Sequence, residues 1–378
     1  MTSIKERKKE IEKVLNQRKL LEVKITQKEK ELKETFYQFK DKFRLKGKQI
    51  VQIPNPDYVS FKEFEKLFSE YIGSKHGVAV NSCTSALEIV LKAIGISDGD
   101  EVIVPAPYWV SYFEIIKLSG GVPVEVPTSI DTDFKITAEQ LEKAITPKTK
   151  MVWYSSPCNP SGSVYSREEL TALAKVLEKH PNIYVVSDEI YEHINFSGTF
   201  CSIASIPGML EKTITVNGVA KAFAMTGWRI GYIGAPEFIA KACTKIQGQV
   251  TSGANSIAQR ATIAAVEADP KVLNYMVEAF HKRRDLVVGL IKEIPGLKIN
   301  VPEGAFYVFP DVSSYFGKTL NGTKIENATD FSMYLLAEAN VATVTGEAFG
   351  NPDCIRFSYA TSEELLTEAM RRIKQALA

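Results

Sequence analysis

Short apolar strands alternate with amphipathic helices along most of this chain, from residue 61 onward. Such alternation predicts an α/β fold with a mostly parallel sheet that helices cover on both faces. The expected strands are Gly77–Val80, Glu101–Val104, Val122–Glu125, Met151–Tyr154, Ile183–Val186 and Lys212–Val216. The expected helices are Phe61–Tyr71, Ser85–Ile94, Tyr108–Leu118, Ala138–Ala144 and Glu168–Lys179.

The C-terminal part of the chain has a different order of elements. Long helical patterns cover Pro236–Ala268 and Lys271–Ile294. Short strands near Ala305–Phe309, Val341–Val344 and Cys354–Ser358 then alternate with helices Ala328–Ala337 and Glu363–Ala376. With 378 residues the chain is long enough for two cores. We expect a large domain over residues 49–270 and a smaller α+β domain over residues 271–378.

Residues 1–48 differ from the rest of the chain, because they are dense in Lys, Glu and Gln and contain no Gly or Pro before Gly47. This pattern predicts a helical N-terminal segment that lies on the body of the protein or on a partner subunit. A free-standing coiled coil is the alternative, although Arg18 and Lys28 interrupt its apolar stripe. The stripe follows heptad positions a and d at Ile4, Ile11, Val14, Leu21, Ile25, Leu32 and Phe39.

Charge and cysteine content argue against several classes of protein. The 46 Lys and Arg residues nearly balance the 45 Asp and Glu residues, so no overall field favours nucleic acid or an anionic membrane. No apolar run reaches the length of a membrane span, and the charged N-terminus has no apolar signal core. The five cysteines form no CxxC pair and the four histidines lack ligand spacing, which predicts a cytoplasmic protein without a metal site.

One lysine follows an expected strand in a setting that suits Schiff-base chemistry. The strand Thr213–Val216 leads into a turn rich in Gly, Ala and Thr that contains Lys221, and Arg229 follows eight residues later. Small residues allow a flat cofactor to approach the amine, and the arginine can bind a phosphate. Taken alone, a lysine in this position is more often a solvated surface residue.

Three further polar residues follow strands at the same expected edge of the sheet. Asp188 either pairs with a pyridinium nitrogen, which keeps that ring electron-withdrawing, or caps the next helix. Tyr191 offers its phenol to a ring oxygen of the cofactor, although core packing explains a tyrosine equally well. Asn159 can donate to the same oxygen, although its turn, Ser155–Gly162, also accounts for an asparagine.

The remaining candidates are residues that could bind the cofactor or the substrate, and each has an alternative, purely structural role. Cys83 and Thr84 lie where the helix Ser85–Ile94 is expected to begin, so their segment either binds a phosphate or simply caps the helix. Trp109 either stacks on a pyridine ring or belongs to the core. Arg356 lies in an apolar strand and requires an anionic partner, which is either a substrate carboxylate or a nearby Asp or Glu.

Together these motifs resemble those of the class I aspartate aminotransferases, which are pyridoxal 5'-phosphate (PLP) enzymes of fold type I. The resemblance runs from about residue 98 to the C-terminus and rests on Pro105–Tyr112, Asn159–Gly162, Ser187–Tyr191, Asn217–Gly231 and Arg356–Ala360. Residues 61–97 instead resemble the DegT-type sugar aminotransferases. The resemblance implies that Lys221 carries PLP as a Schiff base and that Asp188 pairs with the pyridine nitrogen of PLP. It also implies that Asn159 and Tyr191 contact the ring oxygen and that Trp109 stacks on the ring. Arg229 is then implied to bind the phosphate of PLP, and Arg356 the α-carboxylate of the substrate.

The implied activity is an aminotransferase that moves an amino group between an amino acid and a 2-oxo acid by a ping-pong mechanism, with aspartate and glutamate as the first candidates. The first alternative is another PLP-dependent reaction, such as that of a lyase, decarboxylase, cyclase or sugar aminotransferase. The second alternative is a catalytically inactive interaction protein. The resemblance also implies a homodimer, to which the loop Ser252–Ser256 contributes.

The lysine that reads the distal carboxylate in aspartate-specific relatives has no counterpart in Asn81–Ala86. We therefore expect a smaller preference for acidic substrates, unless a basic residue between Lys40 and Lys48 replaces it.

Overall fold

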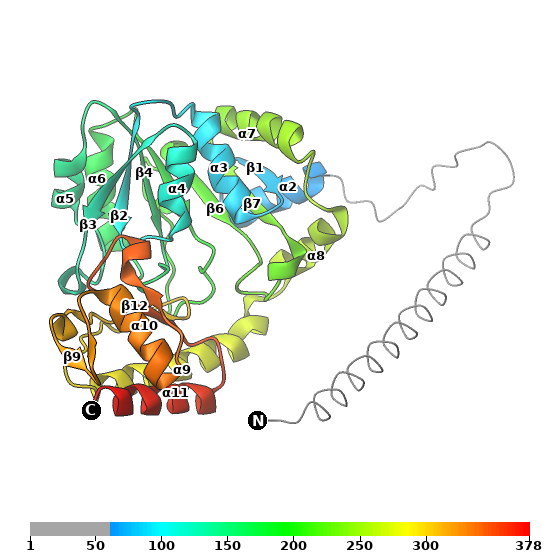
Figure 1. The fold of residues 1–378 in the computed structure, drawn as a ribbon. Helices are drawn as coiled ribbons and strands as arrows, with labels where there is room; N and C mark the ends of the chain where they lie inside the picture. The colour runs from blue at the N-terminus through cyan, green and yellow to red at the C-terminus, as the bar shows by residue number, and fades with distance from the viewer. Residues whose placement is uncertain (1–60) are drawn as a thin grey trace, which may run out of the picture. The chain divides into compact units, whose positions relative to one another are not determined.

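The computed structural model describes residues 61–378 (Figure 1). The predictions for residues 1–48, including the heptad stripe and the basic residues Lys40 to Lys48, lie outside the described residues. Among residues 61–378, no helix is both long and apolar enough to cross a membrane.

A seven-stranded sheet organises the first two thirds of the described chain, in the order β1-β7-β6-β5-β4-β2-β3. Strands β2 to β6 pair in parallel, as predicted, whereas β7 is antiparallel to both of its neighbours. The strands are β1 (His76–Val80), β2 (Glu101–Ala106), β3 (Val122–Pro127), β4 (Thr149–Ser155), β5 (Tyr184–Asp188), β6 (Thr213–Asn217) and β7 (Gly231–Ala235). The sequence analysis missed β7, because a five-residue strand with glycines at Gly231 and Gly234 has little apolar periodicity.

Helices cover both faces of this sheet. Alternation along β2 directs Val102 and Val104 into one core, with α3, α4 and α7, while Ile103 enters the other core, with α5 and α6. Helix α2 packs against β1 and α8. The helices are α2 (Phe61–Tyr71), α3 (Cys83–Ile94), α4 (Ser111–Leu118), α5 (Ala138–Ala144), α6 (Arg167–Glu178), α7 (Glu237–Val250) and α8 (Ser256–Glu267).

The helical pattern over Pro236–Ala268 contains two helices, α7 and α8, which are separated where Ser252 and Gly253 have positive φ angles of 62° and 153° and the side chain of Asn255 caps α8. The helix expected from Tyr108 begins only at Ser111.

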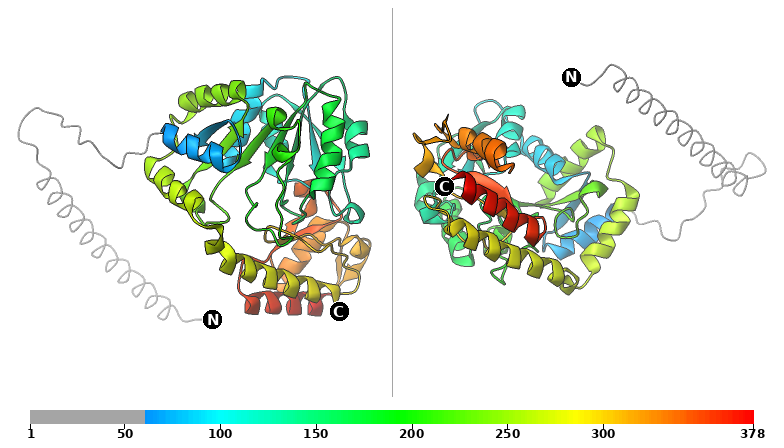
Figure 2. Two further views of the ribbon diagram at one scale, coloured as in Figure 1. Left: turned by 180° about the vertical axis from the view of Figure 1, so that it is seen from behind. Right: turned by 60° about the horizontal axis from the view of Figure 1, so that its bottom comes forward.

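The C-terminal part builds a second apolar core around a three-stranded antiparallel sheet in the order β11-β12-β8. Helices α9 and α11 lie side by side on this part, drawn in yellow and red in Figures 1 and 2. The boundary that we expect at residue 271 stays a prediction. The elements are α9 (Asn274–Lys292), β8 (Tyr307–Val308), the hairpin β9 (Thr319–Leu320) and β10 (Thr323–Lys324), α10 (Ala328–Ala339), β11 (Val344–Thr345), β12 (Ile355–Ser358) and α11 (Glu363–Ala376).

One carboxyl group is buried in the large sheet region without a basic partner among the described residues. Glu189 is 3% exposed, and its Oε1 accepts hydrogen bonds from Ser187 Oγ (2.9 Å) and Ser202 Oγ (2.6 Å). Burial raises the pKa of Glu189 to about 8, and the hydrogen bond from Ser202 opposes this effect only in part. In the unfolded chain the same carboxyl would titrate near 4.5.

This raised pKa makes stability depend on pH. Between the two pKa values the folded chain binds more protons than the unfolded chain, so the free energy of unfolding should fall as pH rises from about 5 to about 8. Glu189→Gln removes the titration, and the stability of this variant relative to the wild type should improve from about pH 5 to about pH 8 by roughly 3 kcal/mol. Urea unfolding at several pH values measures the difference. The exposed Glu168→Gln is the control, and an equal pH dependence in all three proteins would contradict the prediction.

Candidate active site

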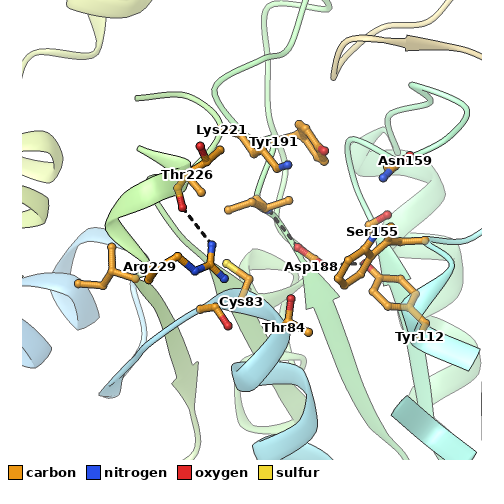
Figure 3. Close-up of a pocket in the computed structure, with 15 residues that line it drawn as sticks. Cys83, Thr84, Tyr112, Ser155, Asn159, Asp188, Tyr191, Lys221, Thr226 and Arg229 are labelled. Carbon is orange, nitrogen blue, oxygen red and sulfur yellow. Dashed lines mark hydrogen bonds between the residues drawn. The ribbon is translucent and has the colours of Figure 1, made fainter. Parts of the chain in front are cut away.

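The carboxyl ends of the parallel strands meet at one edge of the large sheet, where open α/β sheets bind ligands. Asp188 ends β5, Asn159 and Trp109 lie in the loops after β4 and β2, and Lys221 lies in the loop after β6. A cavity of about 720 Å³, including its open mouth, lies at this edge (Figure 3). Its lining residues are Ser82, Cys83, Thr84, Trp109, Tyr112, Ser155, Asn159, Asp188, Ile190, Tyr191, Ala220, Lys221, Thr226, Arg229 and Ile230. The structure therefore brings together every candidate site residue except Arg356, which does not line the cavity but donates a hydrogen bond to the lining residue Asn159.

Asp188 provides a buried carboxylate at the floor of the cavity. Its side chain accepts hydrogen bonds from Tyr112 Oη at 2.7 Å and from the Ile190 amide at 3.2 Å, and the residue is 5% exposed. Burial raises the pKa of Asp188 to about 6, although both hydrogen bonds and the charge of Lys221 oppose this. No α-helix begins directly after Asp188, and its hydrogen bond from the Ile190 amide closes a turn, so the carboxylate caps a turn and not a helix. No described basic side chain forms a salt bridge with it, which leaves the carboxylate available to a cationic ligand.

Lys221 provides an amine inside the same cavity. Its Nζ lies 5.5 Å from the ring centroid of Tyr191 and 6.0 Å from that of Phe306. Burial lowers the pKa of Lys221, and the charges of Arg356 and Arg229 add to this effect, whereas Cys83 and Asp188 oppose it in part. A lower pKa increases the fraction of neutral amine, which is the nucleophilic form.

The start of α3 and Arg229 lie at one corner of the cavity (Figure 3). Ser82 caps α3 by accepting the Ser85 amide, so the capping alternative is correct for this residue. The amides of Cys83 and Thr84 have no hydrogen-bond partner within the described part of the chain, so they can bind a phosphate at the helix N-terminus.

Two backbone features bring these groups together. A Cβ at Gly231 would lie 2.6 Å from the Cys83 nitrogen, so only glycine lets β7 approach the start of α3. Arg229 has a positive φ of 52°, and its Nη1 donates to the Thr226 carbonyl at 3.0 Å.

Arg356, on β12, lies beside the cavity and not in its lining. Its Nη1 donates to Asn159 Oδ1 at 2.9 Å, and its Cζ lies 4.7 Å and 4.9 Å from the ring centroids of Tyr307 and Phe349. No Asp or Glu among residues 61–378 pairs with it, so the alternative of a structural ion pair is wrong for the described chain. Its Nε is buried and has no partner there, so the guanidinium keeps the capacity to bind an anion.

The orientation of Asn159 follows from this contact. Because its Oδ1 accepts from Arg356, its amide nitrogen remains available to donate into the cavity. Trp109 is half-buried, with its ring edge-on to Tyr112 at 5.7 Å, so it lines the cavity and does not belong to the fully buried core. Tyr191 is 3% exposed and its hydroxyl lies 3.0 Å from that of Tyr307.

The sequence analysis missed several residues of the site. Tyr112 follows Trp109 by three residues, which indicates proximity, but only the structure shows that the Tyr112 hydroxyl donates to Asp188. Ser155 and Thr226 were not singled out because a serine or threonine in a turn is common. Tyr307 comes from β8, far along the chain, and only strand pairing places it beside Arg356.

Comparisons with known proteins agree with this fold. A bifunctional aspartate aminotransferase and glutamate/aspartate-prephenate aminotransferase of Petunia hybrida is 50% identical over 286 residues, covering 74% of this chain and 60% of the relative. An aspartate aminotransferase of Pinus pinaster is 46% identical and is covered to 58%. The chain thus spans about three fifths of the length of these two relatives. An aspartate aminotransferase of Rhizobium meliloti (strain 1021) is 44% identical over 324 residues, 83% of this chain and 79% of the relative.

Solved structures extend the likeness to three dimensions. The crystal structure of the aspartate aminotransferase from Rhizobium meliloti superposes with a TM-score of 0.81 at 41% identity, covering 85% of this chain and 83% of that one. The aspartate aminotransferase from Thermotoga maritima gives a TM-score of 0.75 at 35% identity, covering 90% and 86%. The fold is therefore fold type I, as predicted.

The family model for aminotransferase class I and II matches residues 25–373, which include the segment 61–97 with its DegT-like motifs. From this match and from the identities above, the chain belongs to the aminotransferase class I and II family.

Proposed function

We propose that this protein is a PLP-dependent aminotransferase that transfers an amino group between an amino acid and a 2-oxo acid. The observation that carries the proposal is a buried carboxylate, Asp188, and an amine of lowered pKa, Lys221, in the lining of one cavity. The names of the relatives support the same reaction and suggest aspartate and glutamate as first substrates.

The residues of the cavity fit PLP at each of its functional groups. Asp188 is a buried carboxylate without a basic partner among the described residues, which suits a protonated pyridine nitrogen. The unpartnered amides of Cys83 and Thr84, together with Arg229, would bind the phosphate. Tyr191 and the amide nitrogen of Asn159 would donate to the ring oxygen, and Trp109 would stack on the ring.

The chain's own residues then divide the chemical work. When bound, PLP supplies an aldehyde carbon and an electron-withdrawing ring. Lys221 would hold the cofactor covalently and, once the substrate amine replaces it, its neutral Nζ would take the proton from the substrate Cα. Asp188 would keep the pyridine nitrogen protonated. Arg356, held by Asn159, would bind and orient the substrate α-carboxylate.

The covalent link tests the proposal directly. Lys221→Ala should abolish the PLP adduct fixed by borohydride and also turnover, because both need this amine. Peptide mass spectrometry after reduction locates the adduct. Lys245→Ala, an exposed lysine on α7, is the matched control and should behave as the wild type. An adduct on another lysine would overturn the proposal. So would a wild-type protein that binds no PLP, which is the result expected of an inactive interaction protein.

The substrate side chain is the second point to test. Lys221 and Arg229 are the basic residues in the lining formed by residues 61–378, and both are assigned to the cofactor, while Thr84 lies at the expected phosphate corner. A distal carboxylate would thus lack a cation from this part of the chain, which is costly in a desolvated site.

We therefore expect kcat/KM for aspartate to exceed that for alanine and phenylalanine by less than in the aspartate-specific relatives. Thr84→Lys should raise the ratio of aspartate to alanine by roughly tenfold or more, because a charge-assisted hydrogen bond is gained. Thr84→Gln, similar in length but neutral, should leave the ratio unchanged. A large aspartate preference in the wild type would show that another basic residue enters the site.

We also propose a cytoplasmic homodimer. All five cysteines are unpaired, which suits a reducing compartment. The loop after Lys221 packs through Phe223 and Met225 on the cluster that contains Ala254 and Ala258. Three large apolar side chains nearby in the chain are exposed: Trp228 (45%) before β7, Val250 (63%) at the end of α7 and Ile257 (70%) at the start of α8. Exposed apolar side chains beside an open cavity suit burial by a second copy.

A single charge should weaken this dimer. Ile257→Asp places a carboxylate on the exposed start of α8, and we expect the dimer dissociation constant to rise by at least tenfold. Sedimentation over a range of concentrations measures it. Leu118→Asp is the matched control, because Leu118 is 82% exposed at the end of α4 on a different part of the surface. A monomeric wild type, or equal effects of the two variants, would contradict the proposed interface.

A further inference from the structure

Tyr307 lies between Tyr191 and Arg356, although no sequence motif singled it out. Its phenolic oxygen is 3.0 Å from that of Tyr191, and its ring centroid is 4.7 Å from Cζ of Arg356. The residue is 7% exposed and is not part of the cavity lining. One buried side chain thus contacts both a phenol of the cavity and the guanidinium beside it.

Strand pairing places Tyr307 in this position. On the antiparallel pair β8 and β12, Tyr307 lies opposite Ser358, and Arg356 is two residues earlier on β12. Arg356 is therefore a diagonal neighbour of Tyr307 on the same face of the sheet, within reach of a long side chain. Phe349 covers the other side of the guanidinium, with its ring centroid at 4.9 Å from Cζ. The stacked arginine restricts the Tyr307 ring, so its hydroxyl is directed toward Tyr191.

The two hydroxyl groups can form a directional chain. Each phenol has one proton to donate and can accept another hydrogen bond. If Tyr191 donates into the cavity, the hydrogen bond between the two phenols must come from Tyr307. A donated hydrogen bond polarises the next O–H group and strengthens its own donation. Burial raises the pKa of Tyr307, but the positive charge of Arg356, 4.7 Å from its ring centroid, acts in the opposite direction, and a more acidic phenol is the better hydrogen-bond donor.

We propose that Tyr307 is a positioning residue that donates a hydrogen bond to Tyr191 and thereby orients and strengthens the hydrogen bond that Tyr191 makes in the cavity. The inference rests on the proposed function, because it needs a ring oxygen of PLP as the acceptor of Tyr191. It assigns to Tyr307 no contact with substrate or cofactor.

The test is a spectroscopic pH titration of the PLP-loaded protein, with the visible band reporting protonation of the link between Lys221 and PLP. Donation by Tyr191 withdraws negative charge from the ring oxygen and so disfavours the protonated link. Tyr307→Phe keeps the ring and removes the hydroxyl, and we expect it to raise the apparent pKa of the link by roughly half a unit. Tyr191→Phe should raise it further. The charged groups that face this pair, Lys221, Asp188 and Arg356, are the same in all of these variants.

A double-mutant cycle separates positioning from packing. The variant lacking both hydroxyls should have the same apparent pKa as Tyr191→Phe alone, because Tyr307 acts only through Tyr191. The matched control is Tyr359→Phe. The Tyr359 hydroxyl is buried, does not line the cavity and donates a hydrogen bond of 3.2 Å to the Ala305 carbonyl, so its removal should not shift the titration.

An unshifted titration in Tyr307→Phe, or an equal shift with and without the Tyr191 hydroxyl, would overturn the inference while leaving the proposed function in place. Failure of the wild type to form a reducible PLP adduct at Lys221 would overturn both.

Discussion

The hydrogen bond from Tyr112 to Asp188 is the contact on which the arrangement of the site depends. A buried carboxylate is costly unless donors or a cation stabilise it. Asp188 ends the central strand β5, so its position is set by the sheet, while Tyr112 reaches it from α4 at 2.7 Å. Trp109 precedes the same helix and packs edge-on to Tyr112. The acid, its donor and an aromatic wall of the cavity are therefore placed by one helix packed on one sheet.

A second set of contacts joins the C-terminal part of the chain to the loop that carries Asn159. The amides of Glu303 and Gly304 both donate to the Gly162 carbonyl at 2.9 Å. A Cβ at Gly162 would lie 2.5 Å from Pro302, and one at Gly304 would lie 2.6 Å from Pro157, so both positions require glycine for close approach. This packing brings β8 and β12 close to the cavity, and Arg356 reaches Asn159 as a result. The guanidinium and the carboxylate thus come from the two sheets.

Local sequence patterns were sufficient to predict some of the secondary-structure elements but not others. The parallel strands and their helices were predictable because apolar runs of these lengths, separated by turn residues, have few alternatives. Strand β7 was not, since Gly231 is required by the close approach of α3 and Gly234 by that of Ile72 and Ser74, and neither glycine indicates strand pairing on its own. The break between α7 and α8 falls at the start of the expected loop Ser252–Ser256, where a serine and a glycine have positive φ angles.

The sequence by itself determined which candidate residues meet and the edge of the sheet at which they meet. Lys221, Asp188, Asn159 and Trp109 each follow an apolar strand, and parallel strands end at a common edge, so their convergence follows from the order of elements. Only the tertiary structure decided the partners of these groups. Helix packing brings Tyr112 to Asp188, which is 76 residues away in the chain. Strand register and the packing of the C-terminal part bring Arg356 to Asn159 and Tyr307 to Tyr191, and the residues of each of these pairs are more than a hundred residues apart. Hydrogen bonds form over about 3 Å, and no periodicity in a sequence specifies distances on that scale.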